Sequence, residues 1–104
     1  QTIIELHKSI KWEGVLSMVS RKVQVVNPSG LHLRPAGLLC QTSMKFESKV
    51  NILYKDQQIN AKSVLNVMAS GIRCGTGGEV CCDGKDEEEA LEAVCTLIET
   101  GLKE

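Results

Sequence analysis

The stretch Gly-Leu-His-Leu-Arg-Pro-Ala at residues 30–36 predicts a turn that leads directly into an α-helix. Proline suits the first turn of a helix, because its φ is already helical and its missing N–H needs no intrahelical partner there. His32 and Arg34 stand just before Pro35. The free amides and the positive dipole end of the helix would therefore face His32, with Arg34 beside it. This combination indicates an anion site, above all for phosphate, and its histidine could itself be phosphorylated.

Local patterns along the chain predict the element order β-α-β-β-α-β-α. Strands are expected where β-branched or alternating apolar residues stand next to turn signals, at 21–26, 50–54, 58–61 and 79–83. Helices are expected at 33–44, at 64–69 after a Ser63 cap, and after Asp86, which forms a capping-box pattern with Glu89. This order predicts the α+β class, an antiparallel sheet with helices packed on one face.

Composition excludes several classes of function. The 104 residues carry a formal net charge of −1 with mixed signs, so no basic stripe points to nucleic acid. No apolar run approaches the ~20 residues that span a membrane, so no membrane insertion is expected. The five cysteines are odd in number and contain no C-x-x-C pair, which argues against a disulfide framework and against a zinc site. We expect no metal, no cofactor and a reducing cytoplasm.

The string at 30–36 follows Asn-Pro-Ser at 27–29 and resembles the active-site signature of the HPr family of phosphocarriers. That signature usually has alanine or threonine where this chain has Leu33, a bulkier residue that could alter partner fit but removes no chemical group. The resemblance covers 18–104 and implies an open-faced β-sandwich, a four-stranded antiparallel sheet with three helices on one face. It also implies that His32 is phosphorylated, on Nδ1, and that Arg34 stabilises the phosphoryl group.

Residues 60–68 resemble the regulatory serine segment of HPr from Gram-positive bacteria, with Asn66 in place of a glycine. As structure alone, Ser63 is a helix N-cap. The resemblance implies that Ser63 is a kinase target as well, and the two interpretations are compatible. Next to His32 we expect an exposed apolar patch that docks partners, made of Val64, Leu65 and Met68.

The resemblance implies a carrier of the sugar phosphotransferase system rather than an enzyme. His32 would accept phosphate from the phosphoenolpyruvate-charged general enzyme and pass it to sugar-specific acceptor domains. An HPr serine kinase and a catabolite-control transcription regulator are further partners that Ser63 implies. A regulatory paralogue of the Crh type and the nitrogen-related paralogue remain alternatives. Crh lacks the phosphorylatable histidine, and the Lys62-Ser63-Val64 context favours the sugar type.

Residues 1–17 lie outside the resemblance, and Met18 looks like a natural start of the 18–104 domain. Ile3, Leu6 and Ile10 have a spacing that could form one face of a short helix. Two interpretations stay open for this segment: an N-terminal extension appended to the domain, or the tail or linker of a preceding one.

Overall fold

The computed structural model describes residues 7–10 and 16–104. Its strands are β1 (His7–Ile10), β2 (Leu16–Gln24), β3 (Lys49–Tyr54), β4 (Gln57–Asn60) and β5 (Gly77–Asp83). Its helices are α1 (Leu33–Met44), α2 (Val64–Ala69) and α3 (Glu87–Glu99).

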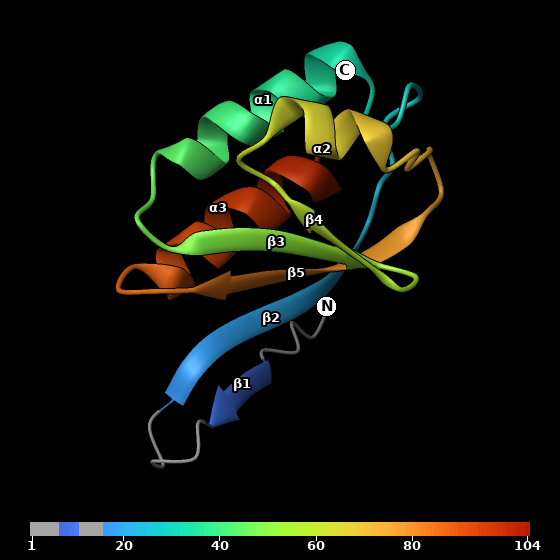
Figure 1. The fold of residues 1–104 in the computed structure, drawn as a ribbon. Helices are drawn as coiled ribbons and strands as arrows, with labels where there is room; N and C mark the ends of the chain where they lie inside the picture. The colour runs from blue at the N-terminus through green and yellow to red at the C-terminus, as the bar shows by residue number, and fades with distance from the viewer. Residues whose placement is uncertain (1–6, 11–15) are drawn as a thin grey trace.

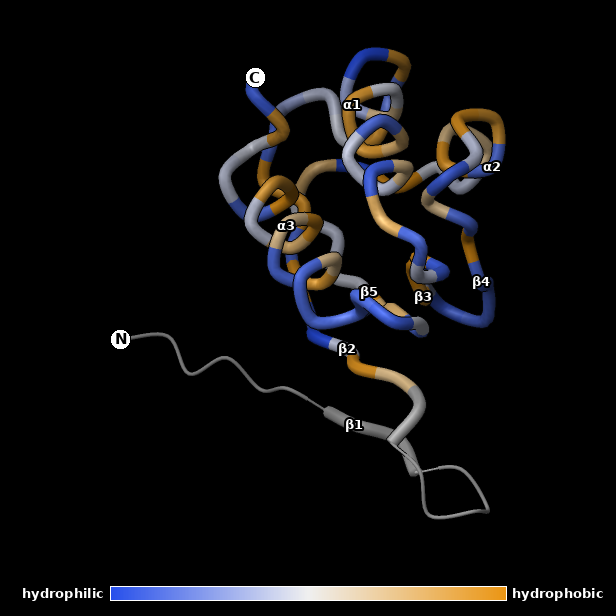
Figure 2. Tube along the Cα trace, turned by 90° about the vertical axis from the view of Figure 1, so that its left-hand side faces the viewer, coloured by the Kyte–Doolittle hydropathy of each residue, from blue (hydrophilic) through white to orange (hydrophobic). Residues whose placement is uncertain are grey.

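The strands form one antiparallel sheet in the order β1-β2-β5-β3-β4 (Figure 1). Four of them, β2, β5, β3 and β4, are the strands that the sequence predicts. The three helices lie on one side of the sheet, as the edge-on view in Figure 2 shows. The expected α+β sandwich with one open face is therefore confirmed.

Strand β1 is an addition to the predicted sheet. It pairs with the outer edge of β2, with His7 opposite Ser20. The expected helical face is thus wrong at Ile10, which lies in a strand; Ile3 and Leu6 fall outside the described residues. Apolar residues spaced by three and four positions are a weak helical signal in so short a segment, because the unpaired edge of β2 offers backbone hydrogen-bond partners to a neighbouring strand.

The core lies between the sheet and the helices. Helix α3 turns one apolar face inward, with Leu91, Val94, Cys95 and Ile98 almost fully buried. The inward positions of the sheet meet them and are mostly β-branched: Val19, Val23, Val50, Ile52 and Val80. Each buried aliphatic side chain contributes about 1.5–3 kcal/mol to folding. The core therefore fixes the helices on the sheet, and with them the loops that connect helices and strands.

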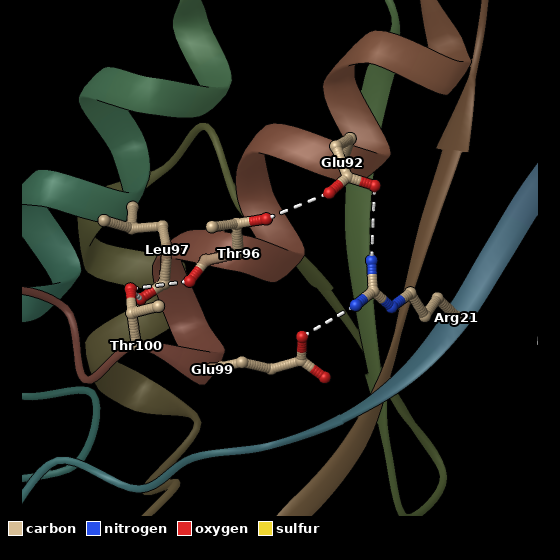
Figure 3. A network of polar contacts seen from close by, with 6 residues as sticks. All are labelled: Arg21, Glu92, Thr96, Leu97, Glu99 and Thr100. Carbon is tan, nitrogen blue, oxygen red and sulfur yellow. Dashed lines mark hydrogen bonds and ion pairs between the residues drawn. The ribbon is translucent and has the colours of Figure 1, made fainter. Parts of the chain in front are cut away.

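A buried arginine ties α3 to β2. Arg21 is only 8% exposed, and its guanidinium donates to Glu99 at 2.8 Å and lies 3.5 Å from Glu92 (Figure 3). Burying a guanidinium is costly unless it is paired, and these two carboxylates of α3 offset that cost. The pairing joins α3 to β2 and stabilises the packing of the helix on the sheet.

The capping box expected at α3 is wrong. Asp86 is the N-cap, but its side chain makes no bond to the helix. Its carboxylate instead accepts hydrogen bonds from the Glu47 N–H, the Ser48 N–H and the Ser48 hydroxyl at 2.5–3.0 Å. The Asp86 carboxylate gains three hydrogen bonds from donors just beyond the end of α1, whereas capping α3 would give it one from a helical N–H. Asp86 therefore joins the end of α1 to the start of α3, and Glu89 stays exposed.

Candidate functional site

The turn before α1 is built around Gly30 and Asn27. Asn27 is 2% exposed, and its Nδ2 donates to the Gly30 carbonyl at 2.7 Å. Gly30 has φ +64, and a Cβ added there would lie 2.6 Å from the Ile72 carbonyl oxygen. Leu31 N–H donates to that same oxygen at 3.0 Å. Only glycine fits this close approach, which fixes the turn against the segment that follows α2.

His32 is the N-cap of α1, as the sequence predicts. Its backbone is extended, with φ −86 and ψ −168, and its ring is exposed. Nδ1 accepts a hydrogen bond from the Leu33 N–H at 2.8 Å. Nδ1 is therefore the acceptor nitrogen of the ring in this geometry, and it is directed at the helix N-terminus. The geometry places this acceptor nitrogen at the positive end of a twelve-residue helix.

Arg34 is exposed on the first turn of α1, one residue beyond Leu33. It lines a hollow together with Leu102, Lys103 and Glu104 from the end of the chain. The hollow lined by His32 is a neighbouring one, which Arg34 does not line. The arginine thus flanks the histidine from the side of the C-terminal segment.

Glu104 closes the turn from outside, and the sequence analysis missed it. Its carboxylate accepts from Asn27 Nδ2 at 2.9 Å, from the Ser29 N–H at 3.1 Å and from the Ser29 hydroxyl at 2.5 Å. The Ser29 hydroxyl, the Asn27 amide and the Ser29 N–H, with a smaller effect of Arg34, lower the pKa of Glu104. In Figure 1 the C-terminus accordingly lies beside the start of α1.

Ser63 caps α2 as predicted. Its Oγ accepts the Asn66 N–H at 3.2 Å, and its own backbone is extended. Asn66 also accepts the Asn60 N–H through its side chain at 2.7 Å. Gly71, with φ +72, follows the helix in a left-handed conformation. The segment around Ser63 is thus held by local hydrogen bonds.

The expected apolar patch of Val64, Leu65 and Met68 is exposed to solvent only in part. Leu65 is 81% exposed, whereas Val64 and Met68 are half-buried and pack against the core. Met68 lines the same hollow as His32, so α2 does reach the histidine. On α1, Leu33 adds a side chain that is 61% exposed.

Comparison with known proteins identifies the family. A family model described as "PTS HPr component phosphorylation site" matches residues 19–100. The chain belongs to the HPr family of the phosphotransferase system. It is 38% identical over 87 residues to "Phosphocarrier protein HPr" of Treponema pallidum, covering 84% of this chain and 99% of that protein.

Solved structures of the family have the same fold. An HPr of Thermoanaerobacter tengcongensis gives a TM-score of 0.79 at 36% identity, covering 82% of this chain and 96% of that one. The catabolite repression protein Crh of Bacillus subtilis gives 0.66 at 33% identity, covering 76% and 91%. Both the carrier and the regulatory branch of the family are thus structural relatives.

The described part of this HPr-family chain contains no group of side chains suited to a metal ion and no helix able to cross a membrane. All five cysteines are free thiols. Burial raises the pKa of Cys82 and of Cys95 to about 12, so these thiols are unreactive. Cys40 is half-buried, and its thiol donates to the Lys62 carbonyl at 3.1 Å.

Proposed function

We propose that this chain is a phosphocarrier of the sugar phosphotransferase system with His32 as the phosphorylated residue. The observation that carries the proposal is the position of His32 Nδ1, which accepts the Leu33 N–H at the N-terminus of α1. The general phosphoenolpyruvate-dependent enzyme is the donor, and sugar-specific domains are the acceptors. The chain is then a carrier rather than an enzyme and works in the cytoplasm, where its free thiols stay reduced.

Transfer needs a neutral nucleophile and charge neutralisation. Once the Leu33 N–H releases Nδ1, the Nδ1 lone pair forms the new P–N bond while the bond from phosphorus to the donor breaks. The reverse exchange delivers the group to the acceptor. The loose transition state of phosphoryl transfer asks mainly for positioning and for cancelled charge. The backbone N–H groups of Leu33 and Arg34 have no intrahelical partners, so they can donate to the phosphoryl group and cancel part of its charge. The Arg34 guanidinium supplies a planar set of N–H donors.

Ser63 is the proposed regulatory residue, a kinase target. A phosphate there adds about −1.5 to −2 charge beside Leu65 and Met68. An acidic partner docking over α2 and His32 would be repelled, while the helix keeps its cap. Val64, Leu65 and Met68 are the proposed docking residues, with Leu65 the most accessible of them.

A regulatory function of the Crh type is the second candidate, favoured by the structural relationship to Crh and by Ser63, which is half-buried at the start of α2. In that case phosphoserine would recruit a catabolite-control regulator and His32 would carry no phosphate. The presence of His32 with Arg34 favours the carrier, although one protein can serve both functions.

The test is a transfer assay with phosphoenolpyruvate, the general enzyme and a sugar-specific acceptor domain. We expect label to pass to the acceptor only when the chain is present, and His32→Ala to abolish passage while the variant remains folded. Binding of a Ser63-phosphorylated chain to the regulator, without any transfer by the parent, would instead establish the second candidate.

A further inference from the structure

Arg73 is a cation of the His32 hollow that no sequence motif marks. The hollow is lined by the turn before α1, by Met68 of α2 and by the segment after α2. Its ionisable lining side chains are His32, Arg73 and Cys74. Arg34 lies in the neighbouring hollow, which it shares with Glu104. Arg73 is therefore the arginine on the histidine's own side.

The backbone of Arg73 is held firmly against the turn that presents His32. A Cβ on Gly30 would lie 2.8 Å from the Arg73 Cα and 3.1 Å from its carbonyl carbon. Leu31 N–H bonds to the Ile72 carbonyl at 3.0 Å, and the Arg73 carbonyl accepts the Thr76 N–H at 3.1 Å. Because Gly30 has no side chain, the backbone of Arg73 can lie directly against it, two positions before His32.

The charge of Arg73 is not cancelled by the residues around it. Its side chain is exposed, and no ion pair or hydrogen bond of its guanidinium is found within residues 7–10 and 16–104. No carboxylate lines the hollow. By contrast, Arg34 lies near enough to Glu104 to lower the pKa of that carboxyl. Of the two arginines, Arg73 has more of its charge available for a new anion.

We propose that Arg73 is a second phosphoryl-neutralising residue, acting on the phosphoryl group of His32 from within the hollow that the histidine lines, whereas Arg34 lines the neighbouring one. This inference rests on the proposed function, because it needs a phosphoryl group on His32. A doubly charged group in this hollow lies well within the Debye length of about 10 Å at 0.1 M salt. The planar guanidinium can also donate to two phosphoryl oxygens at once, which a lysine ammonium cannot do in the same way.

The test uses phosphoramidate, a small phosphoryl donor that requires no protein partner. Its P–N bond breaks and ammonia leaves as the P–Nδ1 bond forms, and mass spectrometry in alkaline solution follows the product on the full chain. The variants are Arg73→Gln, Arg73→Lys and a matched control, Lys85→Gln. The control removes one exposed positive charge from a different hollow, at the start of α3.

We expect Arg73→Gln to slow labelling of His32 about fivefold, the effect of one exposed charge contact. Arg73→Lys should lie between that variant and the parent, and Lys85→Gln should match the parent. Added salt should slow the parent more than Arg73→Gln, because the lost interaction is electrostatic. Thermal melts should agree within a few degrees, since the described contacts of Arg73 are made by its backbone.

Equal labelling of Arg73→Gln and the parent would overturn the inference alone, and the phosphocarrier proposal would stand. The same holds if Arg73→Gln is slower only with the general enzyme, because Arg73 would then be a docking residue. If the parent accepts phosphate on His32 from neither phosphoramidate nor the general enzyme, the proposed function fails, and this inference fails with it.

Discussion

At the scale of single residues, His32 depends on neighbours from three parts of the chain. Leu33 donates to its Nδ1, Gly30 lets the turn approach Ile72, and Glu104 holds Ser29. Arg34 has an exposed side chain, and its proposed role, like that of Arg73, is to neutralise the charge of the phosphoryl group.

Arg34→Lys should slow phosphoryl transfer to His32, because the charge remains but the planar fork is lost. Arg34→Ala should slow transfer further, by about tenfold if a charge-assisted hydrogen bond in the transition state is lost. The transfer rates of both variants are measured in quenched time courses with the general enzyme. The melting temperature should hardly change in either variant, and unaltered rates in both would make Arg34 a mere surface charge.

At this scale, the sequence predicts those parts of the site that neighbouring residues in the chain determine. Pro35 and the two polar residues before it are sufficient to place His32 at a helix start. Glu104 and Arg73 were missed because each reaches the site through tertiary contacts and neither lies in a recognisable motif. No sequence spacing shows that residues 102 and 103 take φ +52 and +60, the left-handed turn that precedes Glu104.

At the scale of elements, α1 begins and ends where the sequence predicts, and Ser63 caps α2. The capping box at Asp86 failed because its competing donors, Glu47 and Ser48, lie 39 and 38 residues earlier. A capping motif indicates which backbone N–H groups of its own helix a side chain can bind. It does not indicate which donors from distant parts of the chain the tertiary fold places beside it.

Ser63→Asp should keep a capping oxygen and leave the thermal melt unchanged, while slowing transfer from the general enzyme through weaker docking. Ser63→Ala is the matched opposite: it should lose about 1 kcal/mol of capping and transfer nearly as fast as the parent. Melts and transfer rates are measured on both variants. Normal transfer by Ser63→Asp, together with no modification of Ser63 by an HPr-type kinase, would leave Ser63 as a cap alone.

The contact between Asp86 and the 47–48 loop should make stability depend on pH. Bonds from the Ser48 hydroxyl, the Glu47 N–H and the Ser48 N–H lower the pKa of Asp86 from 3.8 to about 2. Because the folded-state pKa is the lower one, the stabilisation is full above about pH 4 and is lost as pH falls toward 2.

Urea unfolding of the parent and of Asp86→Asn over this range isolates that effect from other acids. The stability difference between the two proteins should shrink as pH falls toward about 2. A difference that stays constant with pH would show that the Asp86 charge does not stabilise the loop.

At the scale of the whole molecule, the four predicted strands and three helices enclose a core whose described members begin at Val19. Strand β1 only extends the outer edge of β2. The division into residues 1–17 and a domain of 18–104 stays a prediction, although β2 itself begins at Leu16.

A chain that begins at Met18 should therefore fold, melt within a few degrees of the full chain and accept phosphate on His32. The reason is that β2 keeps its pairing with β5 from Val19 onward. Calorimetry and the transfer assay are run side by side on both lengths. A large loss of stability would mean that the segment before Met18 is an integral part of the domain, and that the boundary is misplaced.

Site-resolved mapping of the phosphate tests the central claim most directly. The full chain is incubated with phosphoenolpyruvate and the general enzyme, digested in alkaline solution and analysed by mass spectrometry. The account predicts one acid-labile phosphoryl group, on the peptide that contains His32, and none in a folded His32→Ala variant. Undiminished acid-labile phosphate in His32→Ala, or phosphate in the parent at a residue other than His32, would contradict it.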